Sequence, residues 1–278
     1  MLFLWQSVDF ANEILKSSAR VSMYQYIYDN FLLDKRYAKP LAEIENRLTD
    51  LGIHGRIDRM HPLKSLRESI EDGVKKGART IVAVGGDDTF KKILDVLPGK
   101  NVVMGYVPLV GPSPIAELLG IPEGVLACDL LSARLTNTLD IGRVNGQYFL
   151  TAVSFPAEHV QIECEGRYRV ELVHGGRVSV CNTATVDAGS SVNHIGNPFD
   201  GYLDAVFLSG SGRMFSRGGH AGKSVLLLRK IVARAREPFT LFADGRALQQ
   251  QTAEIDVAAE RIRMIIGKGR AFAHAAAM

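Results

Sequence analysis

The stretch from Thr80 to Thr89, Thr-Ile-Val-Ala-Val-Gly-Gly-Asp-Asp-Thr, has the residue types of a phosphate-binding turn. Its β-branched, apolar run predicts a buried strand, and the two glycines permit a sharp turn and a close approach of a ligand to the backbone. A helix is predicted to follow at once, so its free N–H groups point at whatever occupies the turn. The residues leave open a plainer alternative, a tight turn in which an aspartate caps the helix.

Six residues are candidates for binding a phosphate or a nucleotide at this place. Asp87 is also a candidate for the chemistry, because a carboxylate can orient a metal ion or a hydroxyl group. The six are Gly85, Gly86, Asp87, Asp88, Thr89 and, after the next predicted strand, Ser113. Ser113 and Pro114 also fit the first positions of a helix, as N-cap and N1.

The elements that must position this turn alternate between strand and helix. Apolar spacing predicts strands at Met23–Tyr28, 53–57, Thr80–Val84 and Val102–Val107, and helices at 41–51, 63–74, 90–97 and 113–120. Repeated strand–helix units with continuous apolar strands are typical of a parallel sheet covered on both faces. The predicted fold class is therefore α/β, with an N-terminal doubly wound parallel-sheet domain. Ligands bind at the carboxyl ends of such strands.

The second half of the chain is mostly strand. After about residue 136 apolar residues recur at every second position, and Asn145-Gly146 predicts a two-residue hairpin turn. Further strands are predicted at 168–173, 177–182, 202–208, 239–243 and 261–266, with one helix over Lys223–Arg236. We therefore predict a C-terminal β-rich (β-sandwich) domain. The predicted division is an N-terminal extension (1–20), an α/β nucleotide-binding domain (21–130), a β-sandwich substrate domain (131–267) and a tail (268–278).

Motifs along residues 21–267 resemble those of one family. Val84–Thr89 resembles the Gly-Gly-Asp-Gly-Thr signature of diacylglycerol kinase catalytic domains and related lipid kinases, which NAD kinases share. Asp140–Leu150 is similar to the first hairpin of the family's β domain, and Asp200–Asp204 and Ala243–Gly245 follow in the order of its later motifs. The resemblance implies an ATP-dependent lipid kinase that uses Mg²⁺, with Asp244 as the catalytic carboxylate and Asp200 as a metal ligand. Both aspartates also fit plain Asp-Gly turns.

Departures from the family pattern are equally informative. Asp88 replaces the second glycine of the signature, and Lys91 and Lys92 replace the Asn-Glu that usually follows. Val110–Pro114 lacks both polar residues of the family's Gly-Thr-x-Asn-Asp loop. Arg246 stands where the resemblance implies a glutamate that takes the proton from the lipid hydroxyl, and an arginine cannot act as a general base at pH 7.

Two functions are therefore kept open. The first is a lipid kinase that phosphorylates a lipid or another small-molecule hydroxyl. The second is a pseudokinase that binds a nucleotide or a lipid without turnover. An NAD kinase is a third reading, which the first hairpin of the β domain disfavours.

Charge and cysteine usage bound the partners and the compartment. The 33 basic and 30 acidic residues leave a net charge of +3, which excludes a dedicated nucleic-acid binder. Residues 213–236 are basic and carry no acidic residue, so they predict contact with an anionic membrane, against the alternative of a solvated helix. Three scattered cysteines without a CxxC motif, and a start without a basic stretch, predict a reduced, cytoplasmic chain, or one peripheral to the inner membrane face. A homodimer is left open.

Overall fold

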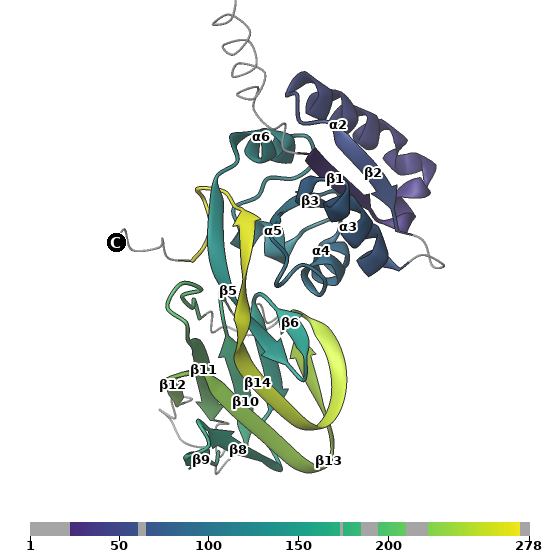
Figure 1. Cartoon of the computed structure of the whole chain (residues 1–278). Helices are drawn as coiled ribbons and strands as arrows, with labels where there is room; N and C mark the ends of the chain where they lie inside the picture. The colour runs from purple at the N-terminus through teal and green to yellow at the C-terminus, as the bar shows by residue number, and fades with distance from the viewer. Residues whose placement is uncertain (1–22, 61–64, 173–174, 185–193, 210–221, 273–278) are drawn as a thin grey trace, which may run out of the picture.

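The computed structural model describes residues 23–60, 65–172, 175–184, 194–209 and 222–272. The predicted N-terminal extension lies outside these residues, and so do residues 273–278 of the predicted tail. The described chain forms a part built of helices and strands and a second part built of strands alone (Figure 1). Among the described residues no helix is both long and apolar enough to cross a bilayer.

The first part contains a parallel sheet. Its strands follow the order β2 (Gly55–Arg59), β1 (Met23–Tyr28), β3 (Ala78–Gly85) and β4 (Val103–Pro108). Successive side chains of a strand point to opposite faces. The Tyr24 hydroxyl accordingly donates to the carbonyl of Leu131 in a helix on one face, and the Gln25 amide donates to the carbonyl of Ser69 in a helix on the other.

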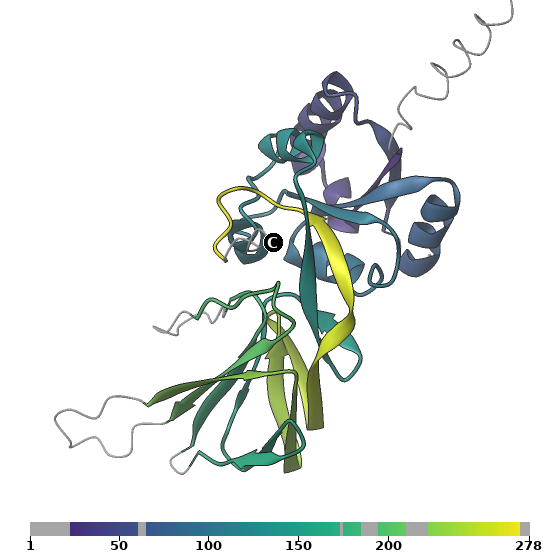
Figure 2. The ribbon, with the colours of Figure 1, turned by 60° about the vertical axis from the view of Figure 1, so that its left-hand side comes forward.

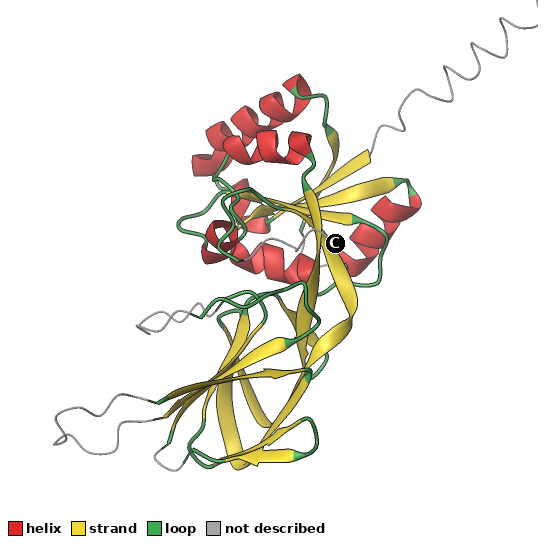
Figure 3. Ribbon diagram, turned by 90° about the vertical axis from the view of Figure 1, so that its left-hand side faces the viewer, coloured by secondary structure: helices red, strands yellow, loops and turns green. Residues whose placement is uncertain are grey.

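Helices therefore cover both faces of the sheet, as Figure 3 shows. The helices are α2 (Ala38–Asp50), α3 (Leu66–Lys75), α4 (Asp87–Leu94), α5 (Pro114–Leu118) and α6 (Leu126–Ala133), and two short 3₁₀ turns, η1 (Asn30–Leu33) and η2 (Lys35–Tyr37), follow β1. The predicted doubly wound parallel sheet is confirmed. Ser113 is the N-cap of α5 with Pro114 in its first turn, as predicted.

The second part has its own hydrophobic core, which includes Val153, Phe155, Val180 and Leu241. Its strands are β5 (Thr136–Val144), β6 (Gln147–Phe149), β7 (Ala152–Pro156), β8 (Val160–Cys164), β9 (Tyr168–Val170), β10 (Gly176–Cys181), β11 (Leu203–Ser209), β12 (Lys223–Leu228), β13 (Lys230–Ala243) and β14 (Arg246–Ile265). Asn145 and Gly146 form the β5–β6 turn with φ of 47° and 87°, which confirms the hairpin.

β14 joins the two parts. It pairs antiparallel with β13 and β5, and near its end Arg263 and Met264 pair in parallel with β4. In Figures 1 and 2 it runs as one long strand from the β-rich part to the parallel sheet. Between α6, which ends at Ala133, and β5, which begins at Thr136, the chain changes from helix–strand alternation to strands. The domain limits stay a prediction.

The helix predicted over residues 223–236 is wrong. Apart from Arg229, these residues form β12 and the first half of β13. The apolar residues Leu228, Ile231 and Ala233 do face a core, but they do so through strand pairing. The helical spacing misled because three of the four residues 225–228 are apolar and exposed on an edge strand, so burial did not follow a period of two. The helix α6 and the strand β8 were not predicted.

Candidate functional site

The turn between β3 and α4 lies at the carboxyl end of the parallel sheet, as predicted. Gly85 has a φ of 152°, and a Cβ on it would lie 2.6 Å from Thr89 Oγ1, so the local fold requires glycine there. A Cβ on Gly86 would meet no atom within 4 Å, and Gly86 caps α4 without any side-chain hydrogen bond. The backbone at Gly86 is therefore open to an approaching ligand, whereas Gly85 serves the turn.

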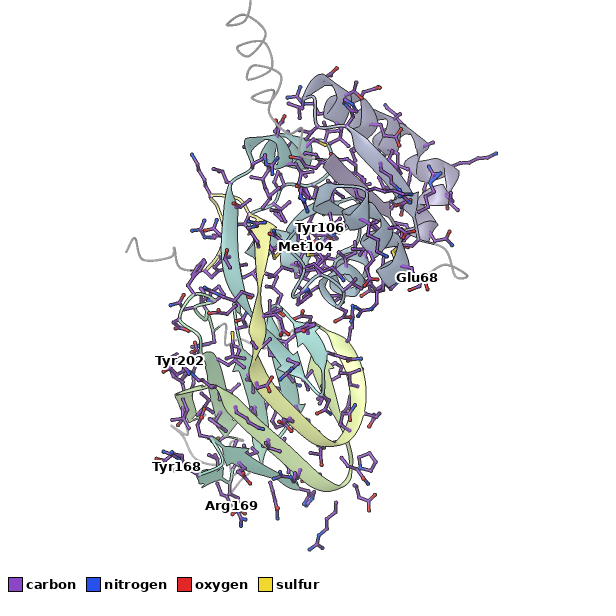
Figure 4. All side chains as sticks on the ribbon, in the orientation of Figure 1. Glu68, Met104, Tyr106, Tyr168, Arg169 and Tyr202 are labelled. Carbon is purple, nitrogen blue, oxygen red and sulfur yellow. The ribbon has the colours of Figure 1, made fainter. Side chains whose placement is uncertain are left out.

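Asp87 and Ser113 come together, as predicted, but they bind each other. One Asp87 carboxylate oxygen accepts hydrogen bonds from the Ser113 hydroxyl and, at 3.0 Å, from the Tyr106 hydroxyl. The other oxygen accepts from the backbone N–H of Ile115 at 3.3 Å. Tyr106 lies on β4 inside the helix–strand part (Figure 4), and burial raises the pKa of its hydroxyl. The Asp87 carboxylate thus anchors the start of α5.

Thr89 is buried and also has an internal partner. Its hydroxyl donates to Asp29 Oδ2 at 2.6 Å, and the backbone N–H of Asp29 donates to Val84 O at 3.1 Å. The sequence interpretation missed Asp29 as a site residue. The available signal was its position directly after β1, since the carboxyl ends of neighbouring parallel strands meet at one edge of a sheet.

Asp88 is the carboxylate of this turn that faces solvent. Its side chain is 77% exposed and pairs at 2.7 Å with the ammonium of Lys91, whose side chain is only 10% exposed. The hydrogen bond from Lys91 holds the pKa of the Asp88 carboxyl below its ordinary value, and the positive charges of Arg246 and Lys92 add to this effect. Lys91 Nζ also donates to the carbonyl oxygen of Asp244 at 3.2 Å, so α4 contacts the β13–β14 turn.

The Asp244 carboxylate accepts its hydrogen bonds within the β-rich part. Oδ2 accepts from the backbone N–H of Leu150 at 2.8 Å, and Oδ1 accepts from the N–H and the hydroxyl of Thr151 at 2.7 and 2.6 Å. Burial raises the pKa of this carboxyl, and these hydrogen bonds oppose the rise. The residue has a φ of 47°, which suits an Asp-Gly turn. Its catalytic role stays a prediction that this geometry does not favour.

Arg246 lies beside the same contact between α4 and the turn. Its Nη1 donates to Asp95 Oδ2 at 2.8 Å, and the two side chains are 27% and 31% exposed. Asp95 follows the last residue of α4, so this ion pair and the Lys91 contact join the same two elements. Arg246, at the position where the family motif has a proton-accepting glutamate, is thus an ion-paired cation.

Asp200 lies shortly before β11 in the chain. It forms a local turn in which Oδ1 accepts from the backbone N–H of Tyr202 at 3.0 Å. The neighbouring N–H of Gly201 donates to Asp140 Oδ2, while the other Asp140 oxygen pairs with Arg261 at 2.7 Å. Within the described ranges no three histidine, cysteine or acidic residues gather in a way that could hold a metal ion. The predicted Mg²⁺ role of Asp200 stays untested.

The basic segment is only partly described. Arg213 and Arg217 lie outside the described residues. In β13, Arg234 pairs with Glu163 at 3.2 Å, and Lys230 pairs with Glu254. Arg229 stacks over Tyr202, which lies at the edge of the β-rich part in Figure 4. Partners from other strands therefore offset part of the positive charge that the sequence places here.

Comparison with known proteins identifies the family that the chain resembles. Residues 33–144, from η1 to the end of β5, match the family model of the diacylglycerol kinase catalytic domain. The predicted resemblance is confirmed. The diacylglycerol kinase of Bacillus subtilis (strain 168) is 36% identical over 74 residues, which are 25% of this chain and 24% of that protein. A probable lipid kinase YegS-like of Pseudomonas aeruginosa is 31% identical over 86 residues, 30% of this chain and 28% of that protein. The matches thus span only about a quarter of each relative's length.

Solved structures extend the likeness of fold to most of the chain. A diacylglycerol kinase of Bacillus anthracis str. Sterne superposes with a TM-score of 0.70 over 90% of this chain and 98% of that one, at 16% identity. A second structure, described as a putative diacylglycerol kinase of the same organism, gives the same TM-score over 89% of this chain. The diacylglycerol kinase-like fold therefore includes the β-rich part, beyond the segment that the family model matches.

Proposed function

We propose that this chain is a nucleotide-binding protein of the diacylglycerol kinase-like fold that does not complete phosphoryl transfer to a lipid hydroxyl by itself. The observation that carries the proposal is the Arg246–Asp95 ion pair at the position of the motif's proton acceptor. Phosphoryl transfer to a hydroxyl needs a group that accepts the hydroxyl proton, and a guanidinium cannot do so. A lipid-kinase-like fold is thus combined with an arginine at the position of the proton acceptor.

The two predicted catalytic carboxylates support the same proposal. Asp87 and Asp244 each accept three hydrogen bonds from their own part of the fold. Because these oxygens already accept hydrogen bonds within the fold, they have less acceptor capacity left for a substrate hydroxyl. Asp88 is exposed, but its ammonium partner lowers its pKa and so weakens it as a base.

ATP and Mg²⁺ fit the glycine turn on two observations. The Gly86 backbone faces open space at the start of α4, where unpaired N–H groups and the helix dipole favour a phosphate. The exposed Asp88 carboxylate offers an oxygen ligand of the kind that Mg²⁺ prefers. When bound, Mg²⁺ neutralises phosphate charge, and it would offset the repulsion between Asp88 and the nucleotide.

An active lipid kinase is the second candidate, which the names of the similar proteins favour. Turnover separates the two functions. Calorimetry should detect ATP binding by the full chain in the presence of Mg²⁺. The same protein should release no additional ADP when vesicles containing diacylglycerol are supplied.

A matched pair of variants locates the binding. Gly86→Ala should weaken ATP binding about tenfold, because its methyl group occupies the open space at the turn. Gly269→Ala, also at a glycine with no atom near its Cβ position, should leave binding unchanged. Lipid-dependent ADP release by the unaltered chain, lost in Gly86→Ala, would contradict the proposal and establish an active kinase.

A further inference from the structure

Five charged side chains gather where α4 meets the β13–β14 turn. Three are cationic and two are anionic: Lys91, Lys92 and Arg246, with Asp88 and Asp95. They form two ion pairs, Asp88 with Lys91 and Arg246 with Asp95. Lys92 is close enough to lower the pKa of Asp88. The cluster therefore has an excess of positive charge beside the open backbone of the glycine turn.

The Arg246–Asp95 pair leaves bonding capacity unused. A guanidinium and a carboxylate can form two parallel hydrogen bonds, but here Nη1 alone reaches Asp95. Arg246 Nη2 and Asp95 Oδ1 are both buried and have no hydrogen-bond partner among the described residues. Leaving such buried atoms unpaired costs free energy. A ligand oxygen that reached Nη2 would recover part of this cost.

Lys91 is the second cation with a replaceable partner. Its ammonium is largely removed from water and is compensated by the Asp88 carboxylate and the Asp244 carbonyl. Asp88 is mostly solvent-exposed, and ion pairs of exposed groups contribute little to stability. The Asp88 side chain can therefore rotate into water when another anion takes its place, while the carbonyl keeps Lys91 in position.

We propose that Lys91 and Arg246 bind a phosphate group of the ligand, and that Asp88 occupies the anion position beside Lys91 until the ligand arrives. The inference rests on the proposed function and adds the chemical class to it: a terminal phosphate or phosphomonoester with two negative charges. Arginine matches such a group because its planar fork meets two phosphate oxygens at once, and lysine adds a compact charge. Arg246 thus replaces proton acceptance with phosphate binding.

Two sources can supply this phosphate: a nucleotide, or the headgroup of a phosphorylated lipid. The experiment uses the full chain with ADP in the absence of Mg²⁺, and with phosphatidylcholine vesicles containing either phosphatidic acid or phosphatidylglycerol. Phosphatidic acid carries a phosphomonoester, whereas phosphatidylglycerol carries only a singly charged diester. Calorimetry measures ADP binding, and co-flotation measures vesicle binding.

Arg246→Gln should weaken binding of the preferred phosphate about tenfold or more, as expected for hydrogen bonds to charged groups. Asp88→Asn should tighten it several-fold, because a competing anion has been removed. Arg47→Gln is the matched control: it removes an arginine of α2 that is ion-paired with Asp129, and it should change nothing. Since Asp88 is exposed, Asp88→Asn keeps the test valid even if Arg246→Gln fails to fold.

The outcomes separate the two proposals. The inference is supported if Arg246→Gln weakens and Asp88→Asn tightens the binding of either ADP or phosphatidic acid. The ligand that responds in this way is then the source of the phosphate. Mg²⁺-dependent ATP binding, with ADP and phosphatidic acid binding insensitive to both variants, overturns the inference and leaves the proposed function intact. No ATP binding under any condition overturns the proposed function, and the phosphatidic acid arm then decides the inference alone. If the chain binds vesicles containing phosphatidylglycerol as well as those containing phosphatidic acid, the binding is a general charge effect and the inference is overturned.

Discussion

Two turns that contain glycine and aspartate lie at the contact between α4 and the β13–β14 turn, and they use their aspartates differently. In the turn before α4, Asp87 faces inward to Ser113 and Tyr106, while Asp88 faces water and Lys91. In the β13–β14 turn, Asp244 faces inward to Leu150 and Thr151. The inward carboxylates stabilise their own parts of the fold. Asp88, which is exposed, and the partly buried Arg246 both lie at the contact, and both depart from the family motif.

This contrast indicates how a kinase-like scaffold can change its chemistry. Residues that hold the turns together also satisfy buried donors, so replacing them would cost stability. Residues that only face the contact between α4 and β13–β14 are free of that constraint. The following variants test whether the division into structural and ligand-facing charges is correct.

The largest effect is expected from restoring a carboxylate at position 246. Arg246→Glu alone would place two acidic groups together, so it is combined with Asp95→Asn. This double variant should raise lipid-dependent ATP turnover by about 10²-fold or more, the usual contribution of a general base. A coupled assay for ADP release measures it. Asp95→Asn alone serves as the control and should stay inactive. If the double variant folds and binds ATP but shows no rise, residue 246 is not the position of the missing base.

The two glycines of the first turn should differ in how well they tolerate alanine. Gly85→Ala should lower the free energy of unfolding by about 3 kcal/mol, because its φ of 152° and its contact with Thr89 both disfavour a Cβ. Gly86→Ala should change it by less than about 0.5 kcal/mol. Urea denaturation followed by circular dichroism measures both. Equal losses in the two variants would show that the open space at Gly86 does not exist in solution.

The inward role of Asp244 can be tested by stability rather than activity. All three partners of its carboxylate are donors, so in Asp244→Asn the new NH₂ group must face one of them. The expected loss is about 1–3 kcal/mol in the free energy of unfolding. Asp200→Asn is the control, because the hydrogen bond that Asp200 accepts from the backbone N–H of Tyr202 can be accepted equally by an amide oxygen. Full stability in Asp244→Asn, together with changed ATP turnover, would return Asp244 to a catalytic role.

The smallest effect concerns pH and the exposed Asp88–Lys91 pair. Because the folded-state pKa of Asp88 is lowered, its pair with Lys91 stabilises the fold above the ordinary aspartate pKa. That contribution disappears as the pH falls through the lowered value. The free energy of unfolding of the wild type, measured by urea denaturation, should therefore exceed that of Asp88→Asn by a few tenths of a kcal/mol near pH 6. This difference should disappear near pH 3. An advantage that grows on acidification would contradict the pairing.

Much of the fold was predictable because the burial of side chains produces a local pattern of apolar residues in the sequence. The continuous apolar run of β3, the Asn145-Gly146 hairpin and the Ser113-Pro114 helix start all depend on neighbours in the sequence, and the structure confirms each. The prediction failed at residues 223–236, where an edge strand exposes three apolar side chains. There the local pattern did not report burial, and pairing with β11 decided the conformation.

For the candidate site, the sequence by itself determined which residue types are present: the glycine turn, the extra aspartate at position 88 and the arginine at position 246. Only the tertiary structure decided their partners. Asp87 and Ser113 are 26 positions apart, and Lys91 and Asp244 are 153 apart, so no local spacing could show that each pair forms a hydrogen bond. The free energy of a charged group depends on the donors, charges and water around it, and strands from both parts of the chain supply that surrounding.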